Sequence, residues 1–511
     1  MFSVPLMQYG GSLNMRGKNR CVLILLVTFL LLQTIFFGCS RTPNIENTEA
    51  SSADTTFDGT ISLWVVTEKT GAFMMNDVIK KIAEDYEASH ENVVIKVDIL
   101  PDDAEEREIR LESLRADIMA GNGPDVFLLP TNTKSRREEM LFLDVVQSMY
   151  NGMFTDIGPY YDADYALEKE ELQTTVMNAG VLGDARYVLP LRYSIDTLLI
   201  DREELAKYGV SEEEITGSIN DLFEVILQKK DPMLAYSAAM YSISDARPFP
   251  ELIDYENEQV LLTKEEVGAY LKAYLQWDAL GVIEGTSNRD PQPRASSTSS
   301  YVSSANYWQS GGFPVHVESL VDAVHSYVIA EAVGASGFAA YPLRSSDGSV
   351  VASVTYWGAI GTGCENVDVA YDFLRQFLCE ETQWELGRSA KQAGAACSLY
   401  EAGYPVRIKG SVSPISVSVV NTASLAVDND DIKAGEARMG ALKTVELTDG
   451  DFPLLDVEID AVRFPNLWEA EFRFRRMAME REAENGKPTD EEIEELAQEM
   501  IRDLEFHLAE G

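Results

Sequence analysis

The chain has 511 residues, of which 42 are Lys or Arg and 84 are Asp or Glu, so its formal net charge is −42. A chain this acidic repels phosphate, which argues against a nucleic-acid-binding protein. Hydrophobic residues make up 45% of the chain, which argues against a disordered protein, and only one apolar run approaches the length of a membrane span, which argues against a polytopic membrane protein.

The N-terminus has the parts of a secretion signal. Basic residues over 16–20 precede an apolar run over 21–37, which ends at Gly38 and Cys39. The small residue followed by Cys resembles the lipobox of bacterial lipoproteins, although Phe36 departs from its usual Leu. This resemblance implies a signal peptide over residues 1–38 and lipid attachment at Cys39. A retained single-span anchor is the alternative, and either form tethers the body to the cell membrane on its extracytoplasmic face.

The start of the mature chain reads as a spacer. Residues 39–58 are rich in Ser, Thr, Asn and Glu, a composition typical of a flexible tether. Met15 is an alternative start to Met1, because residues 1–14 add nothing that a signal needs. The folded body is expected over 59–511.

Strands and helices alternate at the start of this body. Alternating apolar residues predict strands from Ile61 and from Val93, and a short apolar run predicts a third over 126–129. Apolar residues at helical spacing predict a helix around 78–86 and another around 111–118, the second ending at the glycines after it. This order indicates a parallel sheet covered by helices, hence the α/β class.

The remaining elements are predicted from shorter signals. Residues 187–200 read as paired extended segments broken by Pro190. Helical patterns follow four further positions and end in a last helix that begins with a capping box, Thr489 with Glu492. Those four positions are Asp201, Asn220, Lys264 and Val367.

Two polar stretches, 287–304 and 407–431, interrupt the body. Each could lie at a cleft rim, but a plain insertion is the favoured interpretation. Of the five cysteines, Cys364, Cys379 and Cys397 lie in the body. Their spacing is not of metal-binding type, at most one disulfide can form among them, and buried free thiols are expected.

One segment resembles a family signature. Gly121-Asn122-Gly123-Pro124-Asp125-Val126, preceded by Ala120, resembles the A-G-x-x-P-D-V motif of extracellular solute-binding proteins of the carbohydrate-uptake type, the maltose-binding-like family. The segment from Gly183 to Pro190 resembles that family's Gly-x-x-Tyr-x-x-Pro landmark with a longer spacing. Further matches extend the resemblance over about 60–403, weakly between 251 and 336.

The resemblance implies a fold and a function. It implies the type II fold of periplasmic binding proteins: two lobes, each with a mainly parallel sheet flanked by helices, and a ligand cleft between them. The lobes are expected over 59–190 with 350–400, and over 191–349 with 401–511. It also implies a monomer without cofactors that captures a sugar or oligosaccharide and delivers it to the transmembrane subunits of an ABC importer.

The type of a residue and its position in the predicted elements indicate the candidates for such a cleft. Aromatic rings stack on sugar faces, and polar side chains hold sugar hydroxyls. Each candidate also has an ordinary role open to it, in the core or at the surface; Asp125 is expected to be structural. The candidate ligand-binding residues are Trp64, Thr131, Asn132, Arg192, Tyr193, Trp308 and Trp357.

The Trp308 and Trp357 candidates come from aromatic pairs. Tyr307 and Trp308 lie in a polar loop, where they could form a ligand platform or anchor the loop. Tyr356 and Trp357 are adjacent in a strand and therefore point to opposite faces, so one should be core and the other could contact ligand.

Catalytic and metal sites are not predicted. The chain has four His without metal-ligand spacing, and no hydrolase, metalloprotease or P-loop motif. Two alternatives to the transport receptor stay open: a lipoprotein of the same fold that binds a non-sugar ligand or signals to a sensor, and an exported carbohydrate-active enzyme. Acidic pairs occur throughout so acidic a chain, and none lies in a glycosidase motif.

Overall fold

The structure is a computed structural model, and the residues it describes belong to one compact unit, Phe57–Gly511. The described residues are 60–68, 74–131, 140–232, 234–235, 248–280, 314–320, 337–380, 382–383, 404–407, 415–420, 442–447, 454, 457–464 and 468–509. The signal segment, Cys39, the tether, Asn132 and Trp308 lie outside them.

The first half of the described chain alternates strands and helices as predicted. Its elements are β1 (Ile61–Glu68), α2 (Met74–Ser89), β2 (Val93–Leu100), α3 (Ala104–Met119), β3 (Val126–Pro130), α4 (Val145–Tyr150), α5 (Gly158–Ala163), α6 (Thr174–Asn178), β4 (Val181–Leu182), β5 (Ala185–Arg186), β6 (Val188–Asp201), α7 (Arg202–Lys207) and α8 (Ile219–Lys229). Gly121 adopts a φ of 74° directly after α3, so the predicted glycine stop of this helix is confirmed.

The second half supplies the remaining strands and the long helices. Its elements are β7 (Ile253–Asp254), β8 (Gln259–Val260), α10 (Lys264–Leu280), β9 (Val315–Leu320), β10 (Phe338–Pro342), β11 (Val351–Ile360), α13 (Val367–Arg375), β12 (Tyr404–Pro405), β13 (Ile415–Val420), β14 (Leu442–Leu447), β15 (Ala461–Arg463), α15 (Trp468–Asn485) and α16 (Asp490–Ala509). The capping box before α16 is confirmed, since Thr489 N–H donates to Glu492 and Glu492 N–H donates back to the Thr489 hydroxyl.

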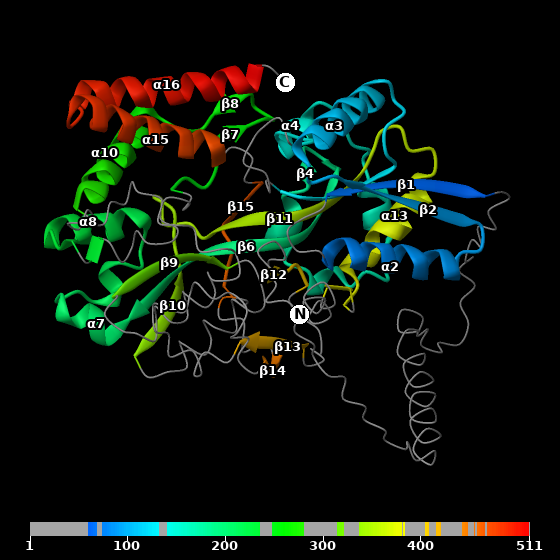
Figure 1. Cartoon of the computed structure of the whole chain (residues 1–511), viewed down its shortest axis with the longest axis horizontal. Helices are drawn as coiled ribbons and strands as arrows, with labels where there is room; N and C mark the ends of the chain where they lie inside the picture. Colours follow the sequence, from blue (N-terminus) through cyan, green and yellow to red (C-terminus); the bar gives the residue numbers. More distant parts are fainter. Residues whose placement is uncertain are drawn as a thin grey trace, which may run out of the picture. The chain divides into compact units, whose positions relative to one another are not determined.

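One mixed sheet runs through the described chain, in the order β10-β6-β11-β3-β1-β2. β1 pairs in parallel with β2 and β3, and β11 pairs in parallel with β15. β6 and β11 are antiparallel to each other and extend across the middle of the structure (Figure 1). Two separate parallel sheets were expected, whereas these two long strands join the lobes into one sheet.

β6 also differs from the prediction of two segments broken at Pro190. It is a single buried strand in which Pro190 is paired with Trp357 of β11. Proline lacks the N–H that a sheet ladder uses, and it is tolerated in strands at irregular positions. The register shifts between Tyr356 and Trp357, so Pro190 lies beside a local irregularity.

Two lobes can be defined by their hydrophobic cores. The first lobe contains two clusters, one with Leu63 and Phe373 and the other with Phe127 and Trp357. The second lobe contains one cluster, in which the C-terminal end of β6 packs with α8, α10, α15 and α16. Among the described residues the chain passes between the lobes three times: within β6, between β10 and β11, and between β15 and α15.

The chain after residue 400 contributes to both lobes. Of the described residues after 400, Tyr404, Val406 and Phe464 pack in the first lobe, and the helices α15 and α16 pack in the second. The expected assignment placed all of 401–511 in the second lobe, so the cores differ from it at these three residues. Within the polar stretch 407–431, residues 415–420 form β13, which pairs with β14 in a separate two-stranded sheet.

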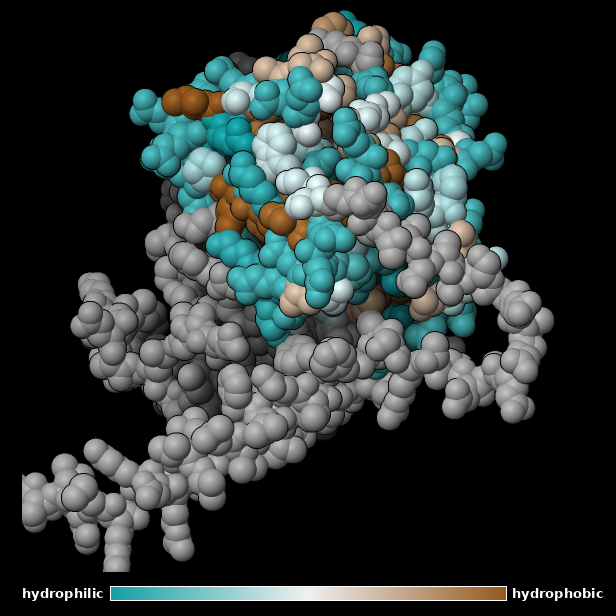
Figure 2. Space-filling view, turned by 90° about the vertical axis from the view of Figure 1, so that its right-hand side faces the viewer, coloured by the Kyte–Doolittle hydropathy of each residue, from teal (hydrophilic) through white to brown (hydrophobic). Residues whose placement is uncertain are grey.

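The described residues on the face drawn in Figure 2 are predominantly hydrophilic, and the hydrophobic ones among them form small groups. Among the described residues no helix combines the length and apolarity needed to cross a membrane.

Candidate ligand-binding site

Polar residues gather where the parallel strands of the first lobe end. β1 ends with Thr67 and Glu68, and Thr131 directly follows β3. The Thr131 N–H donates to the carbonyl of Thr355 in β11 at 2.9 Å, so the end of β3 lies against a strand that leads to the second lobe. Ligands of α/β proteins bind at the carboxyl ends of parallel strands, which makes this edge the candidate site.

A buried ion pair lies at the same edge. Arg107 of α3 and Glu68 approach to 2.8 Å, and their side chains are 1% and 7% exposed. Arg107 also donates to the carbonyl of Pro101, which follows β2. A paired charge held in this way fixes the orientation of the Glu68 carboxylate, because the surrounding structure leaves it little freedom. Sequence reasoning missed Glu68, although an acid ending an apolar strand was the available signal.

Hydroxyl groups near this edge have unused hydrogen-bonding capacity. The side-chain oxygens of Thr131, Ser353 and Thr355 are buried and have no hydrogen-bond partner among the described residues. Thr131 as a whole is 8% exposed and Ser353 is 1% exposed. Buried hydroxyls are normally satisfied by protein, water or ligand. Ser353 and Thr355 were not predicted as site residues. They could have been found as polar residues that alternate within an otherwise apolar strand.

The adjacent Tyr356 has a structural role. Its hydroxyl donates to the carbonyl of Leu128 at 2.9 Å and lies 3.1 Å from the Thr67 hydroxyl oxygen. These contacts join β11 to β1 and β3 across the sheet. The residue is fully buried, so it fixes the strand ends rather than offering an exposed surface.

Arg192 and Tyr193 lie on β6 where the strand leaves the first lobe. Arg192 is 2% exposed and donates a hydrogen bond to the carbonyl of Gln383. Burial lowers the pKa of Arg192 to about 9, because the protein interior disfavours the charged guanidinium. Tyr193 is fully buried, and its ring packs on that of Tyr404 with centroids 5.5 Å apart. Both predicted residues therefore lie in the wall beside the crossing, without an exposed face in this conformation.

Trp64 was expected at the end of the first strand, but the structure places it inside β1. It is the fourth residue of an eight-residue strand, and its N–H donates to the Asp125 carboxylate at the start of β3. Its indole N–H donates to Asp98, and the guanidinium of Arg110 lies 5.5 Å from the ring. The structure thus places Trp64 away from the carboxyl ends of the strands. A site role for Trp64 requires the first strand to end there, whereas β1 continues through Val65 to Glu68.

Trp357 is a core residue in this structure. It is 1% exposed and packs against Phe142 and Phe154, with ring centroids 5.8 and 5.6 Å away. Adjacent strand residues do point to opposite faces, but this sheet is covered on both, so Tyr356 and Trp357 are both buried. A ligand contact of Trp357 stays a prediction, since the rings of Phe142 and Phe154 cover its own in this conformation.

Three predicted positions lie outside the described residues. Asn132 and Trp308 stay predictions as ligand-binding residues, and Cys39 stays a prediction as the lipid site. Cys364 and Cys379 are free thiols, as expected; Cys364 is buried, whereas Cys379 is partly exposed. Within the described residues no cluster of three or more metal-ligating side chains occurs.

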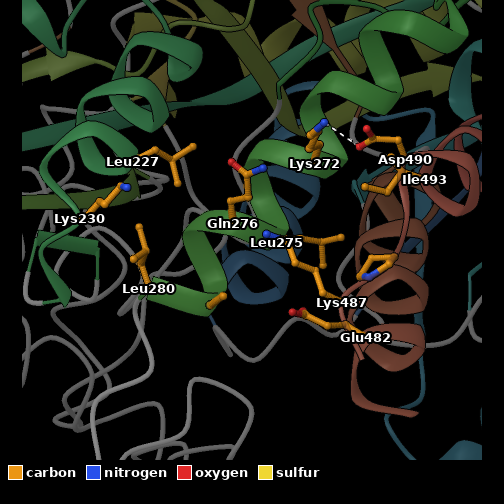
Figure 3. Close-up of a pocket in the computed structure, with 12 residues that line it drawn as sticks. Leu227, Lys230, Lys272, Leu275, Gln276, Leu280, Glu482, Lys487, Asp490 and Ile493 are labelled. Carbon is orange, nitrogen blue, oxygen red and sulfur yellow. Dashed lines mark hydrogen bonds and ion pairs between the residues drawn. The ribbon is translucent and has the colours of Figure 1, made fainter. Parts of the chain in front are cut away.

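A pocket of about 600 Å³ lies away from this edge, among the helices of the second lobe. Figure 3 shows its walls: Leu227 and Lys230 at the end of α8, Leu275 of α10, and Ile493 of α16. Lys272 and Asp490 form an ion pair of 2.7 Å at one side. Because every lining element belongs to the second lobe, this pocket is not the cleft between the lobes.

Comparison with known proteins gives different results for sequence and structure. No family model matches the sequence, and no curated protein matches it. The structure is similar to the sugar-binding protein MalE from Xanthomonas citri, with a TM-score of 0.51 and 13% identity over 88% of this chain and 98% of that one. It is also similar to the cyclic alpha-maltosyl-1,6-maltose binding protein from Arthrobacter globiformis, with a TM-score of 0.50 and 15% identity over 89% and 100% of the two chains.

The fold is that of the type II periplasmic binding proteins. The likeness spans nearly the whole of both solved structures, so the two-lobed α/β architecture expected from the sequence is confirmed. In this fold the sheet edge at Glu68 and Thr131 lies in the first lobe beside the strands that cross to the second.

Proposed function

We propose that this chain is a lipid-anchored extracytoplasmic solute-binding protein that captures a sugar or oligosaccharide between its lobes and delivers it to an ABC importer. The observation that carries the proposal is the shared fold, since both similar structures bear names of sugar-binding proteins. Attachment through Cys39, action as a monomer, and docking on the transmembrane subunits of a permease are parts of the same proposal.

The chemistry of the candidate site supports a polyhydroxylated ligand. The Thr131, Ser353 and Thr355 hydroxyls can each donate and accept, and the Glu68 carboxylate accepts. Sugars present closely spaced hydroxyls with the same dual character. A water-excluded edge with fixed acceptors and donors therefore suits them better than it suits an apolar ligand.

An acidic ligand is the second candidate, because Arg192 is a buried cation. Its guanidinium donates to the neutral carbonyl of Gln383, and burial is the cause of its lowered pKa. A carboxylate near such a guanidinium is favoured by charge pairing. A sugar acid would combine both sets of groups, and a lipoprotein that reports an acidic ligand to a sensor would use them as well.

The test of ligand class is thermal melting of the purified protein against neutral sugars, sugar acids, oligosaccharides and amino acids. A ligand that binds only the folded state raises the melting temperature in a saturable manner. A shift with one glycan class and no product supports the proposal. Product formation would favour the carbohydrate-active enzyme, and no shift with any glycan would overturn sugar binding.

Two matched variants locate the site. Thr131→Val keeps the shape of the side chain and removes its hydroxyl, so affinity should fall about tenfold if a ligand hydroxyl is bound there. Lys230→Gln changes the pocket in the second lobe and should leave affinity unchanged. If Lys230→Gln lowered affinity and Thr131→Val did not, the ligand would be assigned to the pocket in the second lobe rather than to the cleft.

The anchor has a separate test. Mass spectrometry of the chain produced in a bacterial host should show diacylglycerol on Cys39, and Cys39→Ala should release the protein from the membrane. Retention of the variant with residues 1–38 still attached would favour the single-span anchor.

A further inference from the structure

A buried carboxylate that is not part of the candidate ligand site joins the two lobes. Asp144 caps α4, whose Val145 and Met149 pack in the first lobe. Its Oδ2 accepts a hydrogen bond of 2.7 Å from Tyr255, which belongs to the second-lobe core. The same oxygen lies 3.2 Å from Nε2 of His507, in the last turn of α16. Three elements far apart in sequence therefore meet at one carboxylate.

The carboxylate is held in its charged form. Burial would raise the pKa of Asp144, but hydrogen bonds from His507, Tyr255 and the Gln147 N–H hold it below its usual value. Burial and the nearby Asp144 raise the pKa of Tyr255, which keeps its hydroxyl a donor. Asp144 is 3% exposed, so an opposite charge beside it is weakly screened by water.

His507 lies close to the Asp144 carboxylate near the end of α16. Its side chain is 13% exposed, and it lies at the C-terminal end of a 20-residue helix, where the helix dipole favours cations. On α16, Asp503 and Glu505 are acidic and Arg502 is basic.

The elements packed against this end of α16 carry Tyr150 in α4 and Glu258 beside β8, which together with Glu505 line a pocket of about 710 Å³. Lysine and arginine do not line that pocket among the described residues.

We propose that Asp144 and His507 form a proton-dependent clasp between the lobes, in which protonation of His507 stabilises the lobe arrangement of this structure. Neutral His507 retains one hydrogen bond, whereas the imidazolium adds a charge pair, and charge-assisted hydrogen bonds are roughly twice as strong. Histidine is the side chain whose charge ordinarily changes between about pH 5 and 8, so pH is the variable that tests the clasp.

The other contacts on this side hold the lobes together independently of His507. Gln147 of α4 donates to the His507 carbonyl at 2.9 Å, and the Gly183 N–H donates to Glu256 at 2.6 Å. Tyr150 donates to Glu258 at 2.9 Å. These hydrogen bonds hold the lobes in contact at any pH, and the clasp adds a pH-dependent stabilisation to that contact.

The clasp has a consequence for ligand binding that rests on the proposed function. Some ligands would bind only a lobe arrangement in which Asp144 and His507 are apart. Protons favour the opposite arrangement, so such a ligand and protons weaken each other's binding. The affinity of such a ligand then falls as pH falls. The clasp itself is tested without any ligand, so its failure and the failure of the proposed function are distinguishable.

The experiment measures the distance between the lobes in the purified protein. Glu112 of α3 and Glu224 of α8 are exposed, one on each lobe. A keto amino acid at each position carries a spin label without involving the native cysteines, and pulsed electron paramagnetic resonance gives the distance distribution. Between pH 8 and pH 5.5 the ratio of clasped to other arrangements should rise about fivefold or more.

Two matched variants complete the test. His507→Gln keeps a hydrogen-bonding side chain without the titratable charge and should have a distribution independent of pH. Glu505→Gln, on the same helical turn, should respond as the wild type does. A pH response that survives in His507→Gln, or a wild type without any response, would overturn the proposal.

Discussion

Glu68 and Arg107 form an ion pair of 2.8 Å whose two side chains are almost completely buried at the carboxyl ends of β1 and β2. The pair connects the last residue of β1 to α3, two elements that precede and follow β2. Charges buried in this way depend on each other, because neither can recover hydration when its partner is lost.

Glu68→Gln should lower the free energy of unfolding by about 3 kcal/mol, since Arg107 would then be a buried charge without its carboxylate. Urea denaturation at pH 7 measures the loss. The double variant Glu68→Gln with Arg107→Met should recover part of it, because both charges are removed together. A double variant less stable than Glu68→Gln would contradict this account.

Asp144→Asn should destabilise the protein at pH 7 by about 1 to 3 kcal/mol, because a carboxylate with three donors is lost. The folded pKa of Asp144 lies below its unfolded value. Its contribution to stability is therefore present above the unfolded pKa of about 3.9 and is lost as pH falls through the folded pKa. The difference between wild type and variant should shrink below about pH 4 in a series of urea melts. A constant difference from pH 7 to pH 3 would show that folding does not lower the pKa of Asp144.

Trp357→Ala should cost about 3 to 5 kcal/mol of stability, because the indole fills an aromatic core between Phe142 and Phe154. Trp64→Ala should cost less, since Trp64 is only half-buried. Denaturant melts compare the two. If Trp357→Ala left stability intact but abolished ligand binding, the ligand-stacking role first predicted for it would be restored.

Gly180→Ala should destabilise the fold strongly, because an added Cβ would lie 1.9 Å from the carbonyl oxygen of Val188. The backbone of β6 would have to move to relieve this contact. Gly268→Ala is the matched control: it lies within α10 and its nearest contact would be 3.9 Å, so helix propensity alone should stabilise it by up to about 1 kcal/mol. Equal melting temperatures for the two variants would show that the close approach at Gly180 is tolerated.

The start of the first lobe was predictable because its signals are local. The alternation of Ile61, Leu63 and Val65 predicted a strand, and all three pack in one core cluster. Gly121 was expected to end a helix, and its positive φ does so. Each of these inferences needs only the residues of one element and their period.

The errors concern residues whose environment is set by distant segments. Pro190 suggested a break, but β11, which follows some 160 residues later, holds β6 as one continuous strand. Trp357 was expected to face the ligand while Tyr356 faced the core, and the packing of Phe142 and Phe154 over it could not be predicted from its own strand. The contact between Asp144 and His507 spans 363 positions, and no periodicity links such a pair.

The second lobe has a consequence for the order in which this chain acquires its structure. Its core combines residues from β6 to α10 with Leu496, Met500 and Leu504 of the last helix. A ribosome must therefore complete almost the whole chain before this core can close, while the strands and helices of the first lobe emerge early. During synthesis the α10 face that later receives α16 stays uncovered, so chaperone binding should persist until termination and fall sharply afterwards.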